Sequence, residues 1–241
     1  MIALLRVLAV AIFAIVMFVF GCGYCLFSPR NPKHVFTFGR LFGKMSKVFG
    51  ITLELRLPED AYQRGQHIYI ANHQNTWDLF TVSSAVTPKV VTVGKKSLVW
   101  LPLFGQLYWL TGNILIDRAN RTKAKGTIDQ IVDSIKNSDV SVWMFPEGTR
   151  SRGRGLLPFK TGAFHAAIGA EVPIVPIVCS STDGVKLNRW NNGHVIVEML
   201  PPVSSEGFKK ENVRDLATLC REQMAAKLIE LDEEVKQLNK K

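Results

Sequence analysis

The sequence is poor in cysteine and lacks the short motifs of several common enzyme classes. Its four cysteines are scattered, and Cys22 and Cys25 lie inside an apolar run without a second pair at metal-ligand spacing. This pattern disfavours a disulfide framework, a zinc site and a redox site. Neither a Gly-x-Ser-x-Gly elbow nor a His-x-x-x-His motif occurs, so no serine nucleophile and no metal site of that kind is indicated. We therefore predict neither a metal nor a cofactor.

Acidic residues are absent from the first 50 positions, which carry six Lys or Arg. Of the formal net charge of +10, the remaining residues therefore hold only +4. Most of the basic excess lies beside the hydrophobic N-terminus, where it suits anionic lipid. Aromatic residues that would stack on bases are not interleaved with the basic residues near Arg150–Arg154, so we expect no nucleic-acid partner.

The N-terminus contains a long apolar run. Val7–Phe27 has no charged residue over 21 positions, close to the roughly 20 that a membrane-spanning helix needs. Arg30 and Lys33 follow directly, and the positive-inside tendency then places the body of the protein in the cytoplasm. A cleaved signal peptide is disfavoured because no small-x-small cleavage pattern precedes a polar mature start.

The following segment has the periodicity of an amphipathic helix. Its apolar residues share one helical face, and its basic residues share the opposite face. We expect an interfacial helix whose apolar face enters the acyl region of a bilayer, although a helix that packs on the protein core has the same pattern. The two N-terminal helices also fit a hairpin buried in a single leaflet. The apolar face comprises Phe38, Leu41, Phe42, Met45, Val48 and Phe49, and the basic face comprises Arg40, Lys44 and Lys47.

Residues 51–241 alternate between strand-like and helix-like runs, which indicates an α/β fold. We predict a single domain with a mostly parallel mixed sheet flanked by helices, preceded by the membrane-associated residues 1–50. The expected strands are Gln66–Ala71, Val90–Val93, Asn113–Ile116, Val140–Met144, Ile174–Cys179 and His194–Met199. The expected helices are Leu79–Val86, Thr122–Lys136, Thr161–Gly169 and Val213–Leu238.

The segment Asn72–Asp78 combines an imidazole with a carboxylate five residues later. Positions five apart on a regular helix point about 140° away from each other. His73 and Asp78 can therefore meet only if the His lies in a loop and the Asp lies in the first turn of the helix, which Asn75 or Thr76 can cap. In this geometry Asp78 accepts the Nδ1 proton, and Nε2 is left to take a proton from a hydroxyl group. The alternative is an unremarkable loop histidine beside an aspartate favoured by the helix dipole.

Cations and glycines gather after several of the expected strands. Phe145–Ser151 follows a buried run and leads into alternating Arg and Gly at positions 152–155. Arg offers a planar charged fork for phosphate oxygens, and glycines let backbone N–H groups approach an anion. Lys95 and Arg118 follow two other expected strands. Because open α/β sheets bind ligands at strand ends, these groups predict a phosphate site beside His73.

These residues carry a family resemblance. The chain resembles the 1-acyl-sn-glycerol-3-phosphate acyltransferases, the lysophosphatidate acyltransferases of bacterial phospholipid synthesis. Four ordered blocks mark that family, and Asn72–Asp78, Gly94–Arg118, Phe145–Ser151 and Val172–Ile177 match them in order. The resemblance continues through Ser28–His34, Gly105–Thr111 and Leu156–His165.

The resemblance implies transfer of a fatty acyl group from a thioester of acyl carrier protein or coenzyme A, as co-substrate, to the 2-hydroxyl of lysophosphatidate, giving phosphatidate. It also implies a bacterial inner membrane location, with the site on the cytoplasmic side among membrane lipids. Direct transfer is preferred because no nucleophile motif is present. The implied catalytic residues are His73 and Asp78, and the implied phosphate-binding residues are Glu147, Gly148, Thr149, Arg150, Arg118 and Lys95.

Several alternatives remain open at this stage. Glu147 does not attract an anion by its charge, so it has the alternative role of orienting Arg150 or a backbone turn. A related acceptor, glycerol 3-phosphate or another lysophospholipid, is the alternative substrate. A membrane protein that binds anionic lipid without turnover would leave the His–Asp pair unused. Lys123 and Lys125 are candidates for contact with an acidic carrier protein.

Overall fold

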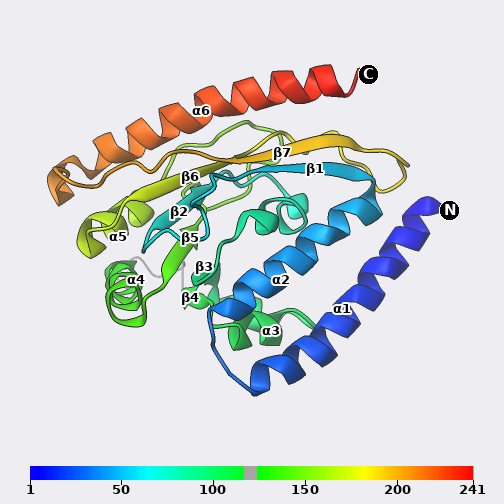
Figure 1. Cartoon of the computed structure of the whole chain (residues 1–241), viewed down its shortest axis with the longest axis horizontal. Helices are drawn as coiled ribbons and strands as arrows, with labels where there is room; N and C mark the ends of the chain where they lie inside the picture. The colour runs from blue at the N-terminus through cyan, green and yellow to red at the C-terminus, as the bar shows by residue number, and fades with distance from the viewer. Residues whose placement is uncertain (117–123, 241) are drawn as a thin grey trace.

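The computed structural model describes residues 1–116 and 124–240 of the chain. Arg118 and Lys123 therefore lie outside the described residues. Seven strands form one sheet in the order β1-β7-β6-β2-β5-β3-β4 (Figure 1). Neighbouring strands are parallel except β6 and β7, which are antiparallel. The strands are β1 Ile51–Arg56, β2 Ile68–Ala71, β3 Val90–Lys95, β4 Ile114–Ile116, β5 Ser141–Met144, β6 Ile174–Cys179 and β7 Gly193–Met199.

The predicted α/β domain with a mostly parallel mixed sheet is confirmed. Every residue of β2 and of β6 is buried, as expected for strands whose sheet is covered on both faces. Helix α6 runs along β6 and β7, and the pair α1 and α2 lies on the other side of the sheet from α6 (Figure 1). The helices are α1 Ile2–Leu26, α2 Lys33–Lys44, α3 Gly105–Leu110, α4 Ala124–Ser138, α5 Gly162–Ala170 and α6 Val213–Leu238.

The edge strand β1 was not predicted. Its sequence alternates apolar and polar residues, and it pairs in parallel with β7 from Ile51↔Gly193 to Arg56↔Glu198. This alternation is the normal signal of a half-buried strand. Short helix α3 was also not predicted, because its six residues are too few to display helical periodicity.

The helix expected over Leu79–Val86 is wrong. The structure has two short 3-10 helices instead, η2 Thr76–Leu79 and η3 Val82–Ala85. Thr81 Oγ1 donates to the Trp77 carbonyl, and Ser83 Oγ donates to the Leu79 carbonyl. Such hydroxyl bonds to preceding carbonyls compete with regular helix bonding, and β-branched Thr81 and Val82 are poor helix formers.

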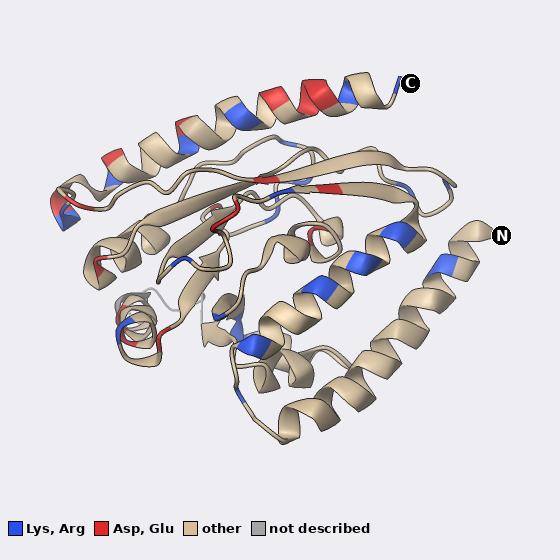
Figure 2. Cartoon of the chain, viewed as in Figure 1, with Lys and Arg blue, Asp and Glu red and all other residues tan. Residues whose placement is uncertain are grey.

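Most of the apolar face of the second N-terminal helix packs against protein, contrary to our expectation of an interfacial helix, although Val48 is 38% exposed. Helix α2 ends at Lys44 and continues as the 3-10 helix η1 Met45–Phe49. Phe38, Met45 and Phe49 are all less than 9% exposed. The Lys and Arg residues of α2, which are blue in Figure 2, are exposed. Met45 and Phe49 join the core that also contains Ile51 of β1. The division of the chain into two parts at residue 50 stays a prediction.

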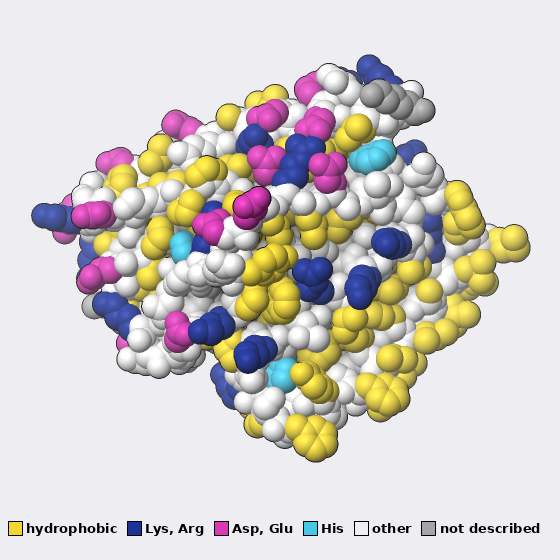
Figure 3. Space-filling view, viewed as in Figure 1, with side chains coloured by type: hydrophobic (Ala, Val, Ile, Leu, Met, Phe, Trp, Pro, Cys, Tyr) yellow, Lys and Arg dark blue, Asp and Glu magenta, His cyan; other side chains and the backbone are white. Residues whose placement is uncertain are grey.

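Helix α1 lies antiparallel beside α2 (Figure 1). Among the described helices, it alone is long and apolar enough to cross a membrane. Its packed side includes Met17 and Cys25, and Phe13 contacts Phe42 edge to face at 5.2 Å between ring centroids. Figure 3 shows the hydrophobic side chains that α1 leaves exposed along one edge of the molecule. They include Leu4, Leu5, Leu8, Ile12, Ile15, Val16, Val19, Phe20 and Leu26.

The N-terminal end of α1 is tied to the domain through Arg6, which is 4% exposed. Its guanidinium donates hydrogen bonds to five backbone carbonyls. The other end is tied down as well, since the Arg30 backbone N–H donates to the Leu110 carbonyl at 2.8 Å. The helix therefore contacts the domain at both ends. The carbonyls that accept from Arg6 belong to Val48, Lys186, Leu187, Arg189 and Trp190.

Candidate active site

The candidate site begins where β2 ends at Ala71. Strand β2 lies at the centre of the sheet, between β6 and β5. Its parallel neighbours end at the same edge, so the loops that follow β2, β5 and β6 converge there. This is the edge at which open α/β sheets commonly place their ligands.

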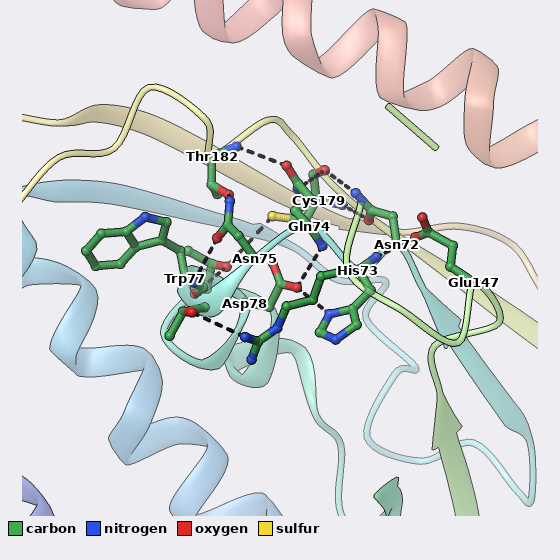
Figure 4. A network of polar contacts seen from close by, with 12 residues as sticks. Asn72, His73, Gln74, Asn75, Trp77, Asp78, Glu147, Cys179 and Thr182 are labelled. Carbon is green, nitrogen blue, oxygen red and sulfur yellow. Dashed lines mark hydrogen bonds and ion pairs between the residues drawn. The ribbon is translucent and has the colours of Figure 1, made fainter. Parts of the chain in front are cut away.

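His73 and Asp78 are in direct contact, as the spacing predicts. His73 lies in the loop, and Asp78 lies in the first turn of η2. His73 Nδ1 is 2.6 Å from Asp78 Oδ2 (Figure 4). Asn75 caps η2 by accepting from the Trp77 backbone N–H at 2.8 Å. The predicted contact and cap are therefore confirmed, while the catalytic role of the pair stays a prediction.

The two members of the pair differ in exposure. The Asp78 side chain is 5% exposed and that of His73 is 20% exposed. Asp78 Oδ2 also accepts from the Gln74 backbone N–H at 2.8 Å, whereas Oδ1 has no partner among the described residues. The His73 ring stacks on Phe145, with 4.2 Å between ring centroids. With Nδ1 donating to the carboxylate, Nε2 is the unprotonated nitrogen of a neutral ring and can accept a proton.

Amide side chains on both sides of His73 fix the loop to the end of β6. Asn72 exchanges two hydrogen bonds with the backbone of Cys179, both at 2.8 Å (Figure 4). Gln74 donates to the Cys179 and Ser180 carbonyls and accepts from the Thr182 backbone N–H at 3.0 Å. The buried amide groups of Asn72 and Gln74 thereby have hydrogen-bond partners, as burial requires.

Glu147 follows β5, which lies on the other side of β2 from β6. Its side chain is 3% exposed. Oε1 accepts from the His73 backbone N–H at 2.6 Å, and Oε2 accepts from the Leu157 backbone N–H at 3.0 Å. Burial raises the pKa of this carboxyl group, although both backbone hydrogen bonds oppose the rise. Each carboxylate oxygen thus faces a protein amide.

The remaining predicted phosphate residues are arranged differently. Thr149 and Arg150 are exposed, and Arg150 Nη1 lies 3.4 Å from Thr76 Oγ1, which places the guanidinium over η2. Gly148 adopts φ +67°, a left-handed conformation that favours glycine. Lys95 is exposed at the end of β3, two strands from β2. Arg118 lies outside the described residues, so its relation to the site stays a prediction.

The arrangement suits proton transfer and anion binding. One imidazole nitrogen can accept a proton, and an exposed guanidinium lies nearby on the loop that follows β5. Among residues 1–116 and 124–240, no group of three His, Cys, Asp or Glu is placed to hold a metal ion.

Sequence reasoning missed the residues that support His73. Asn72 and Gln74 flank it, and two amides at a strand end are a usable signal because a buried loop needs side-chain hydrogen bonds. Ser151 and Arg152 donate backbone N–H bonds to the carbonyls of His73 and Gln74 at 2.8 and 2.9 Å. Backbone contacts of this kind do not depend on residue type, so the sequence does not reveal them.

Comparisons with known proteins identify relatives of this chain. The family model described as Acyltransferase matches residues 52–180. The chain is 59% identical to the 1-acyl-sn-glycerol-3-phosphate acyltransferase of Escherichia coli K12, over 98% of this chain and 96% of the relative. It is 52% identical to the Haemophilus influenzae protein of the same name, over 98% of each chain.

A solved structure is also similar. The crystal structure of the 1-acyl-sn-glycerophosphate acyltransferase from Thermotoga maritima matches with a TM-score of 0.75 and 26% identity, over 95% of both chains. The chain therefore belongs to the acyltransferase family, among the 1-acyl-sn-glycerol-3-phosphate acyltransferases.

Proposed function

We propose that this protein transfers a fatty acyl group from an acyl thioester to the 2-hydroxyl of 1-acyl-sn-glycerol 3-phosphate, with His73 as general base. The observation that carries the proposal is the 2.6 Å contact between His73 Nδ1 and Asp78 Oδ2. It orients the ring and directs Nε2 away from the carboxylate. A positioned base of this kind typically contributes about 10² to 10⁴ in rate.

The proposed step balances without a metal or redox partner. His73 Nε2 takes the proton of the 2-hydroxyl while the hydroxyl oxygen attacks the thioester carbonyl carbon. The new ester C–O bond forms, the C–S bond breaks, and the proton passes to the departing thiolate. Asp78 stabilises the imidazolium that exists between these events, because its carboxylate is buried and aimed at Nδ1.

Arg150, Thr149 and Gly148 are the proposed acceptor site. Arg150 is exposed beside η2 and carries a charge complementary to the phosphate of the acceptor. Lys95 and Arg118 are further proposed cations. By binding the phosphate, these groups would hold the 2-hydroxyl in register with Nε2, and such positioning can supply several kcal/mol of the barrier.

The acyl donor is proposed to be a thioester of acyl carrier protein or coenzyme A. A thiolate is a better leaving group than an alkoxide, so direct transfer needs no covalent intermediate on the enzyme. Lys125 stays a candidate for carrier-protein contact, on the basis of sequence alone.

Helix α1 is proposed to insert into one leaflet of the bacterial inner membrane, with the site on the cytoplasmic side. Its exposed hydrophobic side chains supply the apolar surface. Because Arg6 and Arg30 tie opposite ends of α1 to the same domain, both ends belong on one side of the bilayer. In sealed inverted vesicles, protease should therefore digest a tag at the N-terminus. Protection of the tag would show that α1 spans the membrane.

The test of the reaction is thioester cleavage by the purified protein in detergent. Lysophosphatidate, glycerol 3-phosphate, lysophosphatidylcholine or no acceptor would be supplied in parallel, with either donor, to the protein and to His73→Ala. We expect thiol release that needs lysophosphatidate and is lost in the variant. Full activity in His73→Ala would sink the proposed mechanism, and a different preferred acceptor would change the substrate assignment. No turnover with either donor would favour lipid binding without catalysis.

A further inference from the structure

Glu147 is too enclosed to serve as a ligand for the acceptor phosphate. Its side chain is 3% exposed, and both carboxylate oxygens already accept from backbone N–H groups. A carboxylate has no donor to offer a phosphate oxygen, and its charge repels one. Among the described residues, Glu147 forms no ion pair with a cationic side chain that could offset this repulsion.

We infer that Glu147 is a positioning residue, which acts by fixing the main chain of His73 and not by binding the phosphate. The inference deepens the proposed function and rests on it. The contact to the His73 backbone N–H, at 2.6 Å, joins residues 74 positions apart in the chain. The second contact, to the Leu157 backbone N–H, anchors the same carboxylate to the segment beyond the arginine loop.

Glu147 is part of a clamp on His73 formed by Phe145–Ser151. The Ser151 backbone N–H donates to the His73 carbonyl at 2.8 Å, so the main chain of His73 is held on both sides. The Phe145 ring lies against the imidazole at an interplanar angle of 22°. Asp78 orients the ring (Figure 4), and the clamp sets the position of the main chain from which the ring projects.

A carboxylate suits this position better than its amide analogue. Both partners of Glu147 are donors, so the side chain must accept twice. In Glu147→Gln, the NH₂ group would face one of the two backbone N–H groups. Hydrogen bonds to an ionised acceptor are also shorter and stronger than neutral ones. The substitution keeps the shape of the side chain and removes one of its two contacts.

The test separates positioning from phosphate binding through kcat and KM. Glu147→Gln should lower kcat on the order of 10²-fold, the loss expected when a reacting group is displaced by about 1 Å, and should leave the KM for lysophosphatidate unchanged. Arg150→Gln is the matched comparison and should raise KM more than it lowers kcat. A raised KM with kcat retained in Glu147→Gln would overturn the inference.

A spectroscopic readout separates positioning from general destabilisation. The ¹⁵N-histidine spectrum should contain a His73 Nδ1–H signal, identified by its loss in His73→Ala. This signal should shift in Glu147→Gln and stay unchanged in Ile135→Ala, a core variant. The Ile135 carbonyl accepts from Gln66, which precedes β2 at the end opposite His73. An unshifted signal in Glu147→Gln would contradict the inference.

Three further outcomes separate the conclusions. If Glu147→Gln does not fold, Glu147→Asp, which retains the charge with a shorter reach, should lower kcat by less than about 10²-fold and leave KM unchanged. If His73→Ala keeps full activity, the proposed role of His73 as general base fails. If His73→Ala is inactive while Glu147→Asp and Glu147→Gln change only KM, the inference about Glu147 fails alone.

Discussion

Replacing Asp78 by Asn isolates the contribution of the buried carboxylate. Asp78 Oδ2 accepts from His73 Nδ1 at 2.6 Å and from the Gln74 backbone N–H at 2.8 Å. The amide oxygen of Asn can accept the same two bonds. The NH₂ group would take the place of Oδ1, which has no partner among the described residues. The substitution therefore keeps the geometry and removes the negative charge.

The expected loss follows from the charge that develops on the imidazole. A hydrogen bond to a charged group is worth about 1.5–3 kcal/mol. Two unit charges roughly 4 Å apart interact by about 4 kcal/mol at an effective dielectric constant of 20. Taking about 3 to 4 kcal/mol, and tenfold in rate per about 1.4 kcal/mol, kcat should fall roughly 10²- to 10³-fold. KM should stay the same, because Asp78 is buried behind the imidazole.

The assay is steady-state thiol release with lysophosphatidate and an acyl thioester. Asp129→Asn makes the same chemical change on the exposed surface of α4 and should leave kcat unaltered. The unfolding temperature of both variants should be measured in the same detergent. A folded Asp78→Asn enzyme whose kcat lies within threefold of the parent would refute the reasoning, as would a change confined to KM.

Three other measurements address separate features. Arg150→Gln should raise the KM for lysophosphatidate about 10- to 100-fold, since a hydrogen bond to a charged group is worth about 1.5–3 kcal/mol, and an unchanged KM would exclude phosphate contact. Arg6→Ala should lower the unfolding temperature, because five carbonyls lose their donor, whereas Arg40→Ala on the exposed side of α2 should not. Burial raises the pKa of Glu147 above its ordinary value of 4.5, so the folded state binds this proton more tightly than the unfolded state. The free energy of unfolding should therefore fall as the pH rises from about 4.5 through the folded pKa. Denaturant titrations at several pH values should show this fall in the parent protein and a smaller one in Glu147→Gln.

Much of the fold was predictable because burial imposes a simple pattern. Continuous apolar runs such as Ile174–Cys179 are buried on both faces of the sheet, and the run itself predicts the strand. The amphipathic helix α2 could not be placed in the same way. One apolar stripe packs equally well against lipid and against protein, and the burial of Phe38 in α2 and of Met45 and Phe49 in η1 distinguishes the two.

The site residues also differ in how well the sequence predicts their contacts. The contact between His73 and Asp78 is local, and the geometry of a five-residue spacing predicts it. The orientation of Glu147 is not local, because it depends on how β5 aligns with β2. Charge and motif grouped Glu147 with Arg150, although one side chain is buried and the other is exposed. Residue type alone does not reveal this difference.

The hydrogen bonds around His73 bear on how the chain reaches its active form. The loop that contains His73 depends on Glu147 and Ser151, and through Asn72 and Gln74 on Cys179–Thr182, more than 100 positions away. Contacts over such separations form only after the intervening chain has lost much of its conformational freedom. A nascent chain can thus carry both His73 and Asp78 and still be inactive until residue 182 has been synthesised and β6 has joined the sheet. Recovery of turnover during refolding should accordingly follow assembly of the whole sheet and not the earlier appearance of helical structure.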